Sequence, residues 1–251
     1  MWAKWTLFKA LPIDECSCSV ASSRRKDFIE LAGIYGLILV VIWTPRPWQW
    51  PLWAVTVAIL LKVIVSSYDG LRPMGICTSN LLRSLWGVVL AMLLGMAAVT
   101  LAGRMHTLHV PSTLGAGLRH YGGYALWAAA QQILLQCFFL SRSLRLTSNG
   151  PLAAGVSACL FAIAHLPNPI LTVITLVAGL ASCLFFLRYK NLWPLAVAHA
   201  ILGISIAVTI PGKLDHNMRV GISYLKYVDR TVLSETVPGA TVAPTALPAK
   251  P

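Results

Sequence analysis

Charged residues are scarce in this chain. Of its 251 residues only 11% are Asp, Glu, Lys or Arg, whereas 57% are hydrophobic and the mean hydropathy is +0.72. Soluble domains average about 25% charged residues, so the composition excludes an ordinary soluble domain. It indicates an integral membrane protein whose main partner is the lipid bilayer.

Acidic residues are the scarcer kind of charge. Eight Asp and Glu stand against 20 Lys and Arg, which gives a formal net charge of +12. A basic chain can bind nucleic acid, but these basic residues are scattered between apolar runs and form no single basic face. We therefore expect no nucleic-acid partner and interpret the basic residues as marks of membrane topology.

The six cysteines do not form the pattern of a disulfide framework or of a metal centre. Cys16 and Cys18 make a lone C-x-C pair, for which metal binding or acylation is an alternative, but the pair has no matching second half. The other cysteines lie in or beside apolar segments, where cysteine behaves as a small hydrophobe: Cys77, Cys137, Cys159 and Cys183.

Long apolar runs are abundant by contrast. A helix needs roughly 17 to 25 mostly apolar residues to cross a bilayer, and about seven segments approach that length. They predict an all-α fold, a polytopic transmembrane helix bundle of about seven spans, or roughly six to eight. The expected spans are residues 28–44, 49–67, 85–103, 122–140, 151–166, 169–187 and 191–210.

These spans define the expected domain organisation. Residues 1–27 should be a cytoplasmic N-terminal segment, because they lack the uninterrupted apolar stretch of a cleavable signal. Residues 28–210 should form the membrane domain, and residues 211–251 a tail that is flexible at its end. Pro167 and Pro169 should join the fifth and sixth spans in a close helical hairpin, since proline ends a helix.

The basic residues of the connections predict an orientation. Lys and Arg are retained on the cytoplasmic side of a membrane, and with the N-terminus inside most of them fall in the inner segments. We therefore expect an N-terminus in the cytoplasm and a bacterial inner membrane, or plasma membrane, as the location.

Five polar side chains interrupt the apolar spans. Gln131, Gln132 and Gln136 lie in one span, and His165 and His199 lie in two later ones, while the same segments contain no Asp or Glu. Polar groups at membrane depth are costly and usually functional. On an α-helix Gln132 and Gln136 are one turn apart and share a face.

The stretches around these residues resemble the CPBP family of intramembrane endopeptidases, which includes CAAX prenyl proteases and Abi-type proteins linked to bacteriocin processing and immunity. That family carries Glu-Glu-x-x-x-Arg, then Phe-x-x-x-His, then His-x-x-x-Asn or Asp, on successive helices. The matching stretches here are QQILLQ from Gln131, FAIAH from Phe161 and HAILG from His199. The resemblance covers roughly residues 122–210 and implies a multi-helix bundle with proteolytic activity.

Four positions depart from the family motifs. Glutamines replace the two glutamates and the arginine, and a glycine replaces the asparagine: Gln131, Gln132, Gln136 and Gly203. In the family a glutamate is thought to activate water, whereas a glutamine amide has no useful basicity. A carboxylate-driven hydrolysis is therefore not expected here.

The resemblance nevertheless implies roles for the residues that remain. His165 and His199 would line the site and position water or an oxyanion, while Gln131 and Gln132 would orient substrate or water. Gln136 and Phe161 would help to bind the substrate. No cofactor or metal is required, because two neutral imidazoles fall short of the three protein ligands common in catalytic zinc sites.

Three functions from different classes are consistent with this pattern. The first is an endopeptidase acting on a prenylated or transmembrane peptide. The second is a noncatalytic pseudoprotease that binds a membrane partner, and the third is a membrane enzyme of another class acting on isoprenoid lipid. The glutamines alone could also serve as interhelical hydrogen-bonding residues without catalysis.

Overall fold

The computed structural model describes residues 24–66, 70–72, 74–111 and 113–236. These residues form helices and no strand, which confirms the predicted all-α class. The N-terminal segment 1–23 and residues 237–251 lie outside the described residues, so the expectations for them remain predictions. The elements are α1 Arg24–Trp43, α2 Gln49–Ser66, α3 Leu81–Ser84, α4 Trp86–Arg104, α5 Leu114–Ile133, η2 Leu134–Leu140, α6 Ser141–Thr147, α7 Gly150–Ile163, α8 Pro169–Tyr189, α9 Trp193–Thr209, α10 Gly212–Asp215, η3 His216–Met218 and α11 Gly221–Thr236.

The described helices do not confirm about seven spans. Four are long and apolar enough to cross a membrane, and a fifth is added if a pair bent by 111° counts as one span. α7 has 14 residues, or about 21 Å, which is shorter than a hydrocarbon core of about 30 Å. The four are Gln49–Ser66, Leu81–Arg104, Gly115–Thr147 and Pro169–Tyr189, and the bent pair is Trp193–Thr209 with Gly212–Met218.

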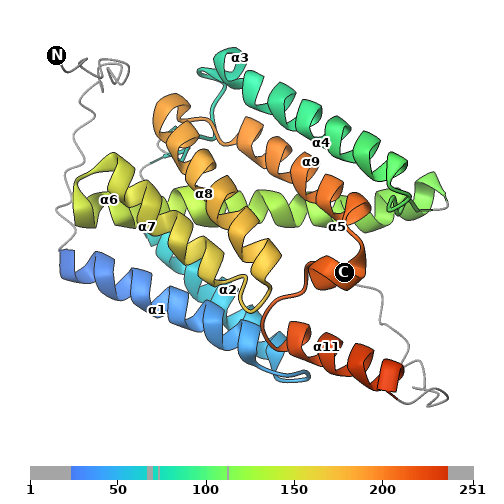
Figure 1. The fold of residues 1–251 in the computed structure, drawn as a ribbon. Helices are drawn as coiled ribbons and strands as arrows, with labels where there is room; N and C mark the ends of the chain where they lie inside the picture. The colour runs from blue at the N-terminus through green and yellow to red at the C-terminus, as the bar shows by residue number, and fades with distance from the viewer. Residues whose placement is uncertain (1–23, 67–69, 73, 112, 237–251) are drawn as a thin grey trace, which may run out of the picture.

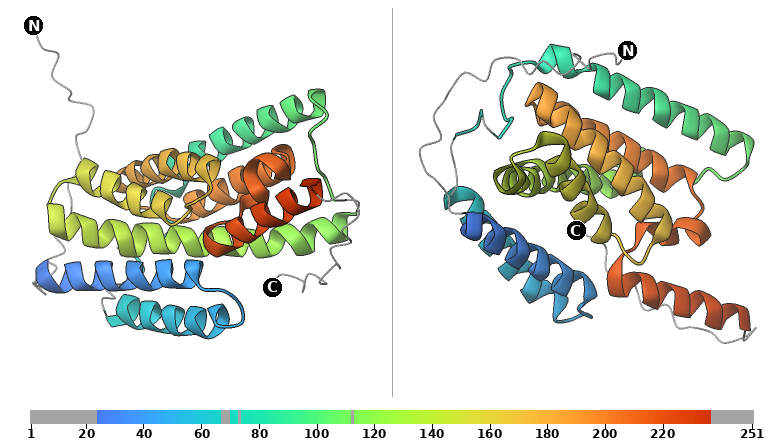
Figure 2. Two further views of the ribbon diagram at one scale, coloured as in Figure 1. Left: turned by 60° about the horizontal axis from the view of Figure 1, so that its bottom comes forward. Right: turned by 60° about the vertical axis from the view of Figure 1, so that its left-hand side comes forward.

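One long helical rod organises the bundle. α5, η2 and α6 follow one another without a break, and the α1–α2 hairpin lies on one side of this rod while α7, α8 and α9 lie on the other (Figures 1 and 2). α9 packs against both α4 and α5. The rod therefore contacts helices from both ends of the sequence.

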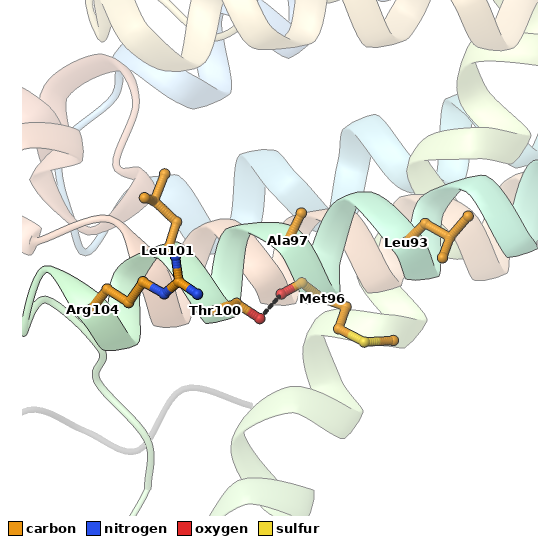
Figure 3. A pocket seen from close by; sticks show the side chains of 6 residues that line it. All are labelled: Leu93, Met96, Ala97, Thr100, Leu101 and Arg104. Carbon is orange, nitrogen blue, oxygen red and sulfur yellow. Dashed lines mark hydrogen bonds between the residues drawn. The ribbon is translucent and has the colours of Figure 1, made fainter.

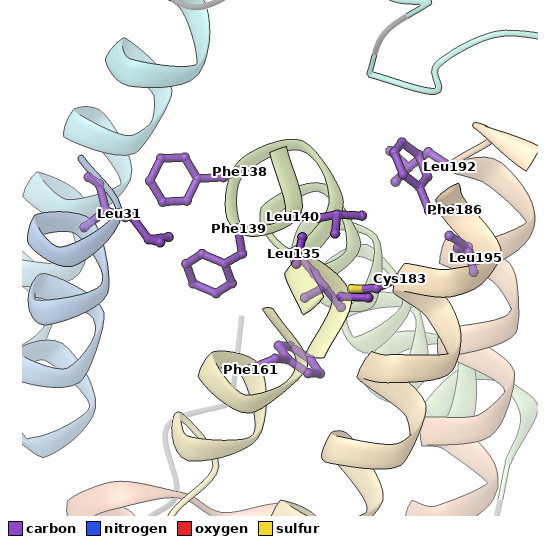
Figure 4. Packing of buried hydrophobic residues seen from close by; sticks show 13 residues of the cluster. Leu31, Leu135, Phe138, Phe139, Leu140, Phe161, Cys183, Phe186, Leu192 and Leu195 are labelled. Atoms are coloured by element: carbon purple, nitrogen blue, oxygen red, sulfur yellow. The ribbon is translucent and has the colours of Figure 1, made fainter. Parts of the chain in front are cut away.

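The hydrophobic core is built around η2. Its side chains Leu135, Phe138 and Phe139 are at most 1% exposed, and they face Leu31 of α1 on one side and Phe161 of α7 on the other (Figure 4). Fully burying one such side chain stabilises a fold by roughly 1.5–3 kcal/mol. The core thus fixes the part of the rod that carries the glutamines.

The predicted α7–α8 hairpin is confirmed, since the two helices pack along each other. Both begin with an asparagine N-cap followed by proline. Asn149 accepts a hydrogen bond from the Leu152 amide at 3.0 Å, and Asn168 accepts one from the Leu171 amide at 3.1 Å. The two caps satisfy amides that a helix start otherwise leaves unpaired.

The segment after Ile210, expected to be a tail, contains α10, η3 and α11. α11 packs against α1, and the Gly221 amide donates to the Leu166 carbonyl at 2.8 Å. Asn168 Nδ2 also donates to the Asp215 carbonyl at 2.6 Å and to the Arg219 carbonyl at 3.2 Å. This segment is therefore tied to the turn between α7 and α8.

Two ion pairs join α1 to α6. Arg145 meets Asp27 at 2.8 Å, and Arg142 meets Glu30 at 3.0 Å. The Arg142 and Asp27 side chains are only 3% and 1% exposed. The buried charges of Arg142 and Asp27 are therefore each paired with an opposite charge, which offsets the cost of removing them from water.

Candidate functional site

Two of the three glutamines lie inside the bundle. Gln132 at the end of α5 is 4% exposed and Gln136 in η2 is 1% exposed. Gln136 Nε2 donates a hydrogen bond to Gln132 Oε1 at 3.0 Å. Gln131 is half-buried, and its side chain makes no hydrogen bond to any other described residue. The structure therefore brings together Gln132 and Gln136 and leaves Gln131 outside their network.

The glutamine pair sits where the rod changes its winding. α5 ends at Ile133, and the next seven residues form a π-helix. Short π-helical turns within α-helices are frequent at functional sites. The change from α-helix to π-helix falls between Gln132 and Gln136. The two side chains nevertheless meet on one face, as expected, and form a hydrogen bond.

Ser182 of α8 holds the far end of this amide pair. Gln136 Nε2 lies 3.4 Å from Ser182 Oγ, and Ser182 Oγ donates to the Gly179 carbonyl at 3.0 Å. Gln136 Oε1 is buried and has no hydrogen-bond partner among the described residues. Ser182 was not predicted as a site residue; its signal in the sequence is a hydroxyl on the apolar segment that follows the second motif.

His199 of α9 receives the other end of the amide pair. Gln132 Nε2 lies 3.1 Å from His199 Nδ1. An amide nitrogen can only donate, so Nδ1 must accept, and a neutral imidazole then carries its proton on Nε2. The neutral His199 ring can therefore donate a hydrogen bond from Nε2, the nitrogen that does not face Gln132.

His165 lies in the turn that follows α7. Its Nδ1 is 2.6 Å from the carbonyl oxygen of Phe161. A carbonyl oxygen can only accept, so Nδ1 carries the proton of the neutral ring and Nε2 keeps its lone pair. The two histidines thus have opposite tautomers, one able to take a proton and one able to donate.

The ring of Phe161 contacts the imidazoles of both His165 and His199. The Phe161 and His165 ring centroids are 4.8 Å apart, and the Phe161 and His199 centroids are 6.2 Å apart. Both pairs are edge-to-face, an arrangement favoured by the charge distribution of aromatic rings. Phe161 is only 5% exposed, so it fixes the two histidines on one wall of the bundle.

The position of the missing asparagine is not an empty space. Gly203 is buried one turn after His199, and a Cβ atom placed on it would overlap the hydroxyl of Tyr124 from α5. Tyr124 was also missed in the sequence, where its position two turns before Gln132 is the only signal. The phenol takes the volume that a side chain at position 203 would need.

Two clefts in the described part of the molecule are lined by no histidine of the site. A shallow hollow of about 420 Å³ runs along the outer side of α4 (Figure 3). A cleft of about 100 Å³ reaches Gln136 from the end of the rod that carries the ion pairs. It is lined by Met74, Gln136, Cys137, Leu140, Ser141, Arg142, Leu144, Arg145, Phe186 and Lys190.

The donor set at the site is neutral. It consists of two imidazoles, two amides, a serine hydroxyl and a phenol, and the described residues hold no group of three His, Cys, Asp or Glu side chains that could bind a metal. Such a set does not fit a zinc centre. It can orient hydrogen bonds, and it can accept one proton at His165 Nε2.

Comparison with known proteins identifies the same part of the chain. Residues 120–204 match the family described as type II CAAX prenyl endopeptidase Rce1-like. The match includes all three motifs and confirms the resemblance drawn from them. No curated protein and no solved structure matches the chain.

Proposed function

Since residues 120–204 match the family described as type II CAAX prenyl endopeptidase Rce1-like, we propose that this integral membrane protein hydrolyses a prenylated or membrane-embedded peptide without a carboxylate base. The observation that carries the proposal is the pair of opposite histidine tautomers. His165 supplies the lone pair, and His199 supplies the hydrogen-bond donor. Together they provide the base and the oxyanion donor that peptide hydrolysis needs.

The proposed reaction has two steps. A water oxygen attacks the carbonyl carbon while its proton passes to His165 Nε2, and the carbonyl electron pair moves onto oxygen as an oxyanion. His199 Nε2–H donates to that oxyanion. The intermediate then collapses, the carbon–nitrogen bond breaks, and the proton on His165 passes to the leaving amine.

The remaining residues act through the histidines. Gln132 keeps the proton of His199 on Nε2, and Gln136 and Ser182 keep the Gln132 amide in the orientation that does so. Phe161 forms the wall against which both rings pack. Gln131 takes no part in the step and, as a half-buried side chain, is proposed to orient substrate.

We also place the protein with its N-terminus in the cytoplasm of a bacterial inner or plasma membrane. The support is the distribution of Lys and Arg between the apolar segments. The ion pairs of α1 with α6 then lie on the cytoplasmic side.

Cleavage of a farnesylated peptide by the protein in lipid nanodiscs tests the function. We expect the wild type to cleave it and His165→Gln to lose at least 100-fold in kcat, because the base is removed. His109→Gln, which changes an exposed loop histidine, is the matched control and should cleave normally. A His165→Gln variant as active as the wild type would contradict the proposal.

A noncatalytic partner-binding role is the second candidate. The replacement of both family glutamates by amides favours it, because the usual water-activating group is absent. Under this role a deletion strain would be rescued by a His165→Ala, His199→Ala variant, and folded wild-type protein would retain the peptide without cleaving it.

A further inference from the structure

The hydroxyl of Tyr124 contacts α9 one helical turn after His199. It lies against Gly203, where any added side chain would collide with Oη, Cζ and Cε1 of the tyrosine. Such overlap is relieved only if the ring leaves. The glycine and the phenol are therefore mutually dependent.

Gly203 and His199 share a face of α9. Residues four apart on a helix lie one turn apart, with Cβ positions about 5–6 Å from each other. That face packs against α5, which carries both Tyr124 and Gln132. The phenol thus enters the site from the same helix that fixes the His199 tautomer.

The Tyr124 hydroxyl is available for a ligand. It makes no hydrogen bond to any other described residue, and the side chain is half-buried. Tyrosine hydroxyls in packed surroundings usually have a partner. The Tyr124 hydroxyl has no such partner and lies one helical turn along α9 from His199, whose Nε2–H is a donor, so the two groups are suited to bind one substrate oxygen.

We propose that Tyr124 is a catalytic residue that donates a second hydrogen bond to the oxyanion formed from the peptide carbonyl. The proposal rests on the hydrolytic function proposed above. In the step, the carbonyl electron pair moves to oxygen as water attacks, and the charge is shared by His199 Nε2–H and Tyr124 Oη–H. The phenol keeps its proton throughout and releases the oxygen when the carbon–nitrogen bond breaks.

The phenol would replace the side chain that the third motif lacks. A donor at position 203 would reach the site from α9, whereas Tyr124 reaches the same volume from α5. The identity of the donor differs, but its location is kept. Restoring a residue at position 203 without removing the ring should consequently be harmful.

Kinetics of three variants in nanodiscs test this assignment. Tyr124→Phe keeps the ring, and we expect kcat to fall by about 10²–10³-fold with KM nearly unchanged, as for the loss of one oxyanion donor. Gly203→Asn alone should lose activity through overlap. Tyr124→Ala with Gly203→Asn should recover at least tenfold over Tyr124→Ala, because the amide fills the vacated volume as a donor.

The control is Tyr35→Phe, which removes a buried tyrosine hydroxyl in α1, far from Tyr124 in the sequence. It should leave kcat unchanged, and thermal unfolding should show that every variant is folded. Wild-type kcat in folded Tyr124→Phe, beside an inactive His165→Gln, would overturn the role of Tyr124 alone. A folded wild type that cleaves nothing would overturn the hydrolytic function and this role with it.

Discussion

At the scale of single residues, the direction of a hydrogen-bond chain decides what each histidine can do. Gln136 has two amide protons, and they go to Gln132 Oε1 and Ser182 Oγ. Gln132 must then present its own amide protons to His199. A carboxylate at position 132 would accept from His199 instead, so replacing glutamate by glutamine inverts the tautomer of the ring beside it.

The two neighbouring glutamines offer a matched pair of variants. Gln132→Leu removes the donor to His199 Nδ1 and leaves Gln136 Nε2 without one acceptor, which costs about 1–3 kcal/mol for buried groups. We expect kcat to fall roughly tenfold, since the His199 tautomer is no longer fixed. Gln131→Leu should raise KM, because Gln131 is proposed to orient substrate, but it should change kcat less than about threefold, because its side chain lies outside the hydrogen-bond network. Equal effects of the two variants would contradict the network.

At the scale of elements, the turn after α7 is held by the start of α8 and by the segment after α9. Asn168 is completely buried; its backbone amide donates to the His165 carbonyl at 3.2 Å, and its side chain bridges to Asp215 and Arg219. The position of the His165 ring therefore depends on residues far away in the sequence.

The two asparagine caps allow this dependence to be measured. Asn168→Ala removes a cap and leaves the buried Asp215 carbonyl and the partly buried Arg219 carbonyl with fewer partners, so we expect a loss of roughly 2–3 kcal/mol in the free energy of unfolding. Asn149→Ala removes a more exposed cap of α7 and should cost only about 1 kcal/mol. Denaturant titration in detergent micelles measures both values. A larger loss in Asn149→Ala would show that the bridge to the C-terminal segment contributes little.

At the scale of the whole molecule, buried ion pairs attach the α1–α2 hairpin to the central rod. Glu30 is shared between Arg142, whose side chain is 3% exposed, and Lys26, whose side chain is 60% exposed. Only the first of these pairs is removed from water. Its two members are held by helices α1 and α6, so the pair contributes to the docking of the N-terminal hairpin.

Glu30→Gln is expected to destabilise the protein by roughly 3 kcal/mol, because it leaves a buried guanidinium without its carboxylate. Lys26→Gln removes only the exposed partner and should change the free energy of unfolding by less than about 1 kcal/mol. Thermal unfolding in nanodiscs compares the two variants. Equal midpoints for both would contradict a role for the Arg142–Glu30 pair in docking.

Much of this architecture could be predicted from the sequence. Apolar periodicity and length predicted helices, and the resemblance to the family motifs implied that one site would be lined by Gln131, Gln132, Gln136, Phe161, His165 and His199, of which Gln131 lies outside the hydrogen-bond network. Those features depend on the local sequence pattern and on the periodicity of the α-helix, both of which can be read from neighbouring residues. The proline pair likewise predicted the α7–α8 hairpin.

Other features depend on contacts between distant segments and could not be predicted. Composition shows that a segment is apolar but not where its helix stops. The expected seven spans are therefore not confirmed: four described helices are long and apolar enough to cross a membrane, or five with the bent pair. The π-helical turn at η2 and the entry of Tyr124 into the space above Gly203 are set by packing between α5, α8 and α9. Sequence spacing along α5 places Tyr124 two turns before Gln132 but does not show that its ring lies against Gly203 of α9.

The most direct test of the central claim is the protonation site of each histidine at the proposed active centre. Nitrogen-15 NMR of histidine-labelled protein in nanodiscs, with His165→Gln and His199→Gln variants for assignment, distinguishes protonated from bare ring nitrogens. We predict that neutral His165 carries its proton on Nδ1 and neutral His199 carries its proton on Nε2. The same tautomer at both positions, or a proton on Nδ1 of neutral His199, would contradict the account.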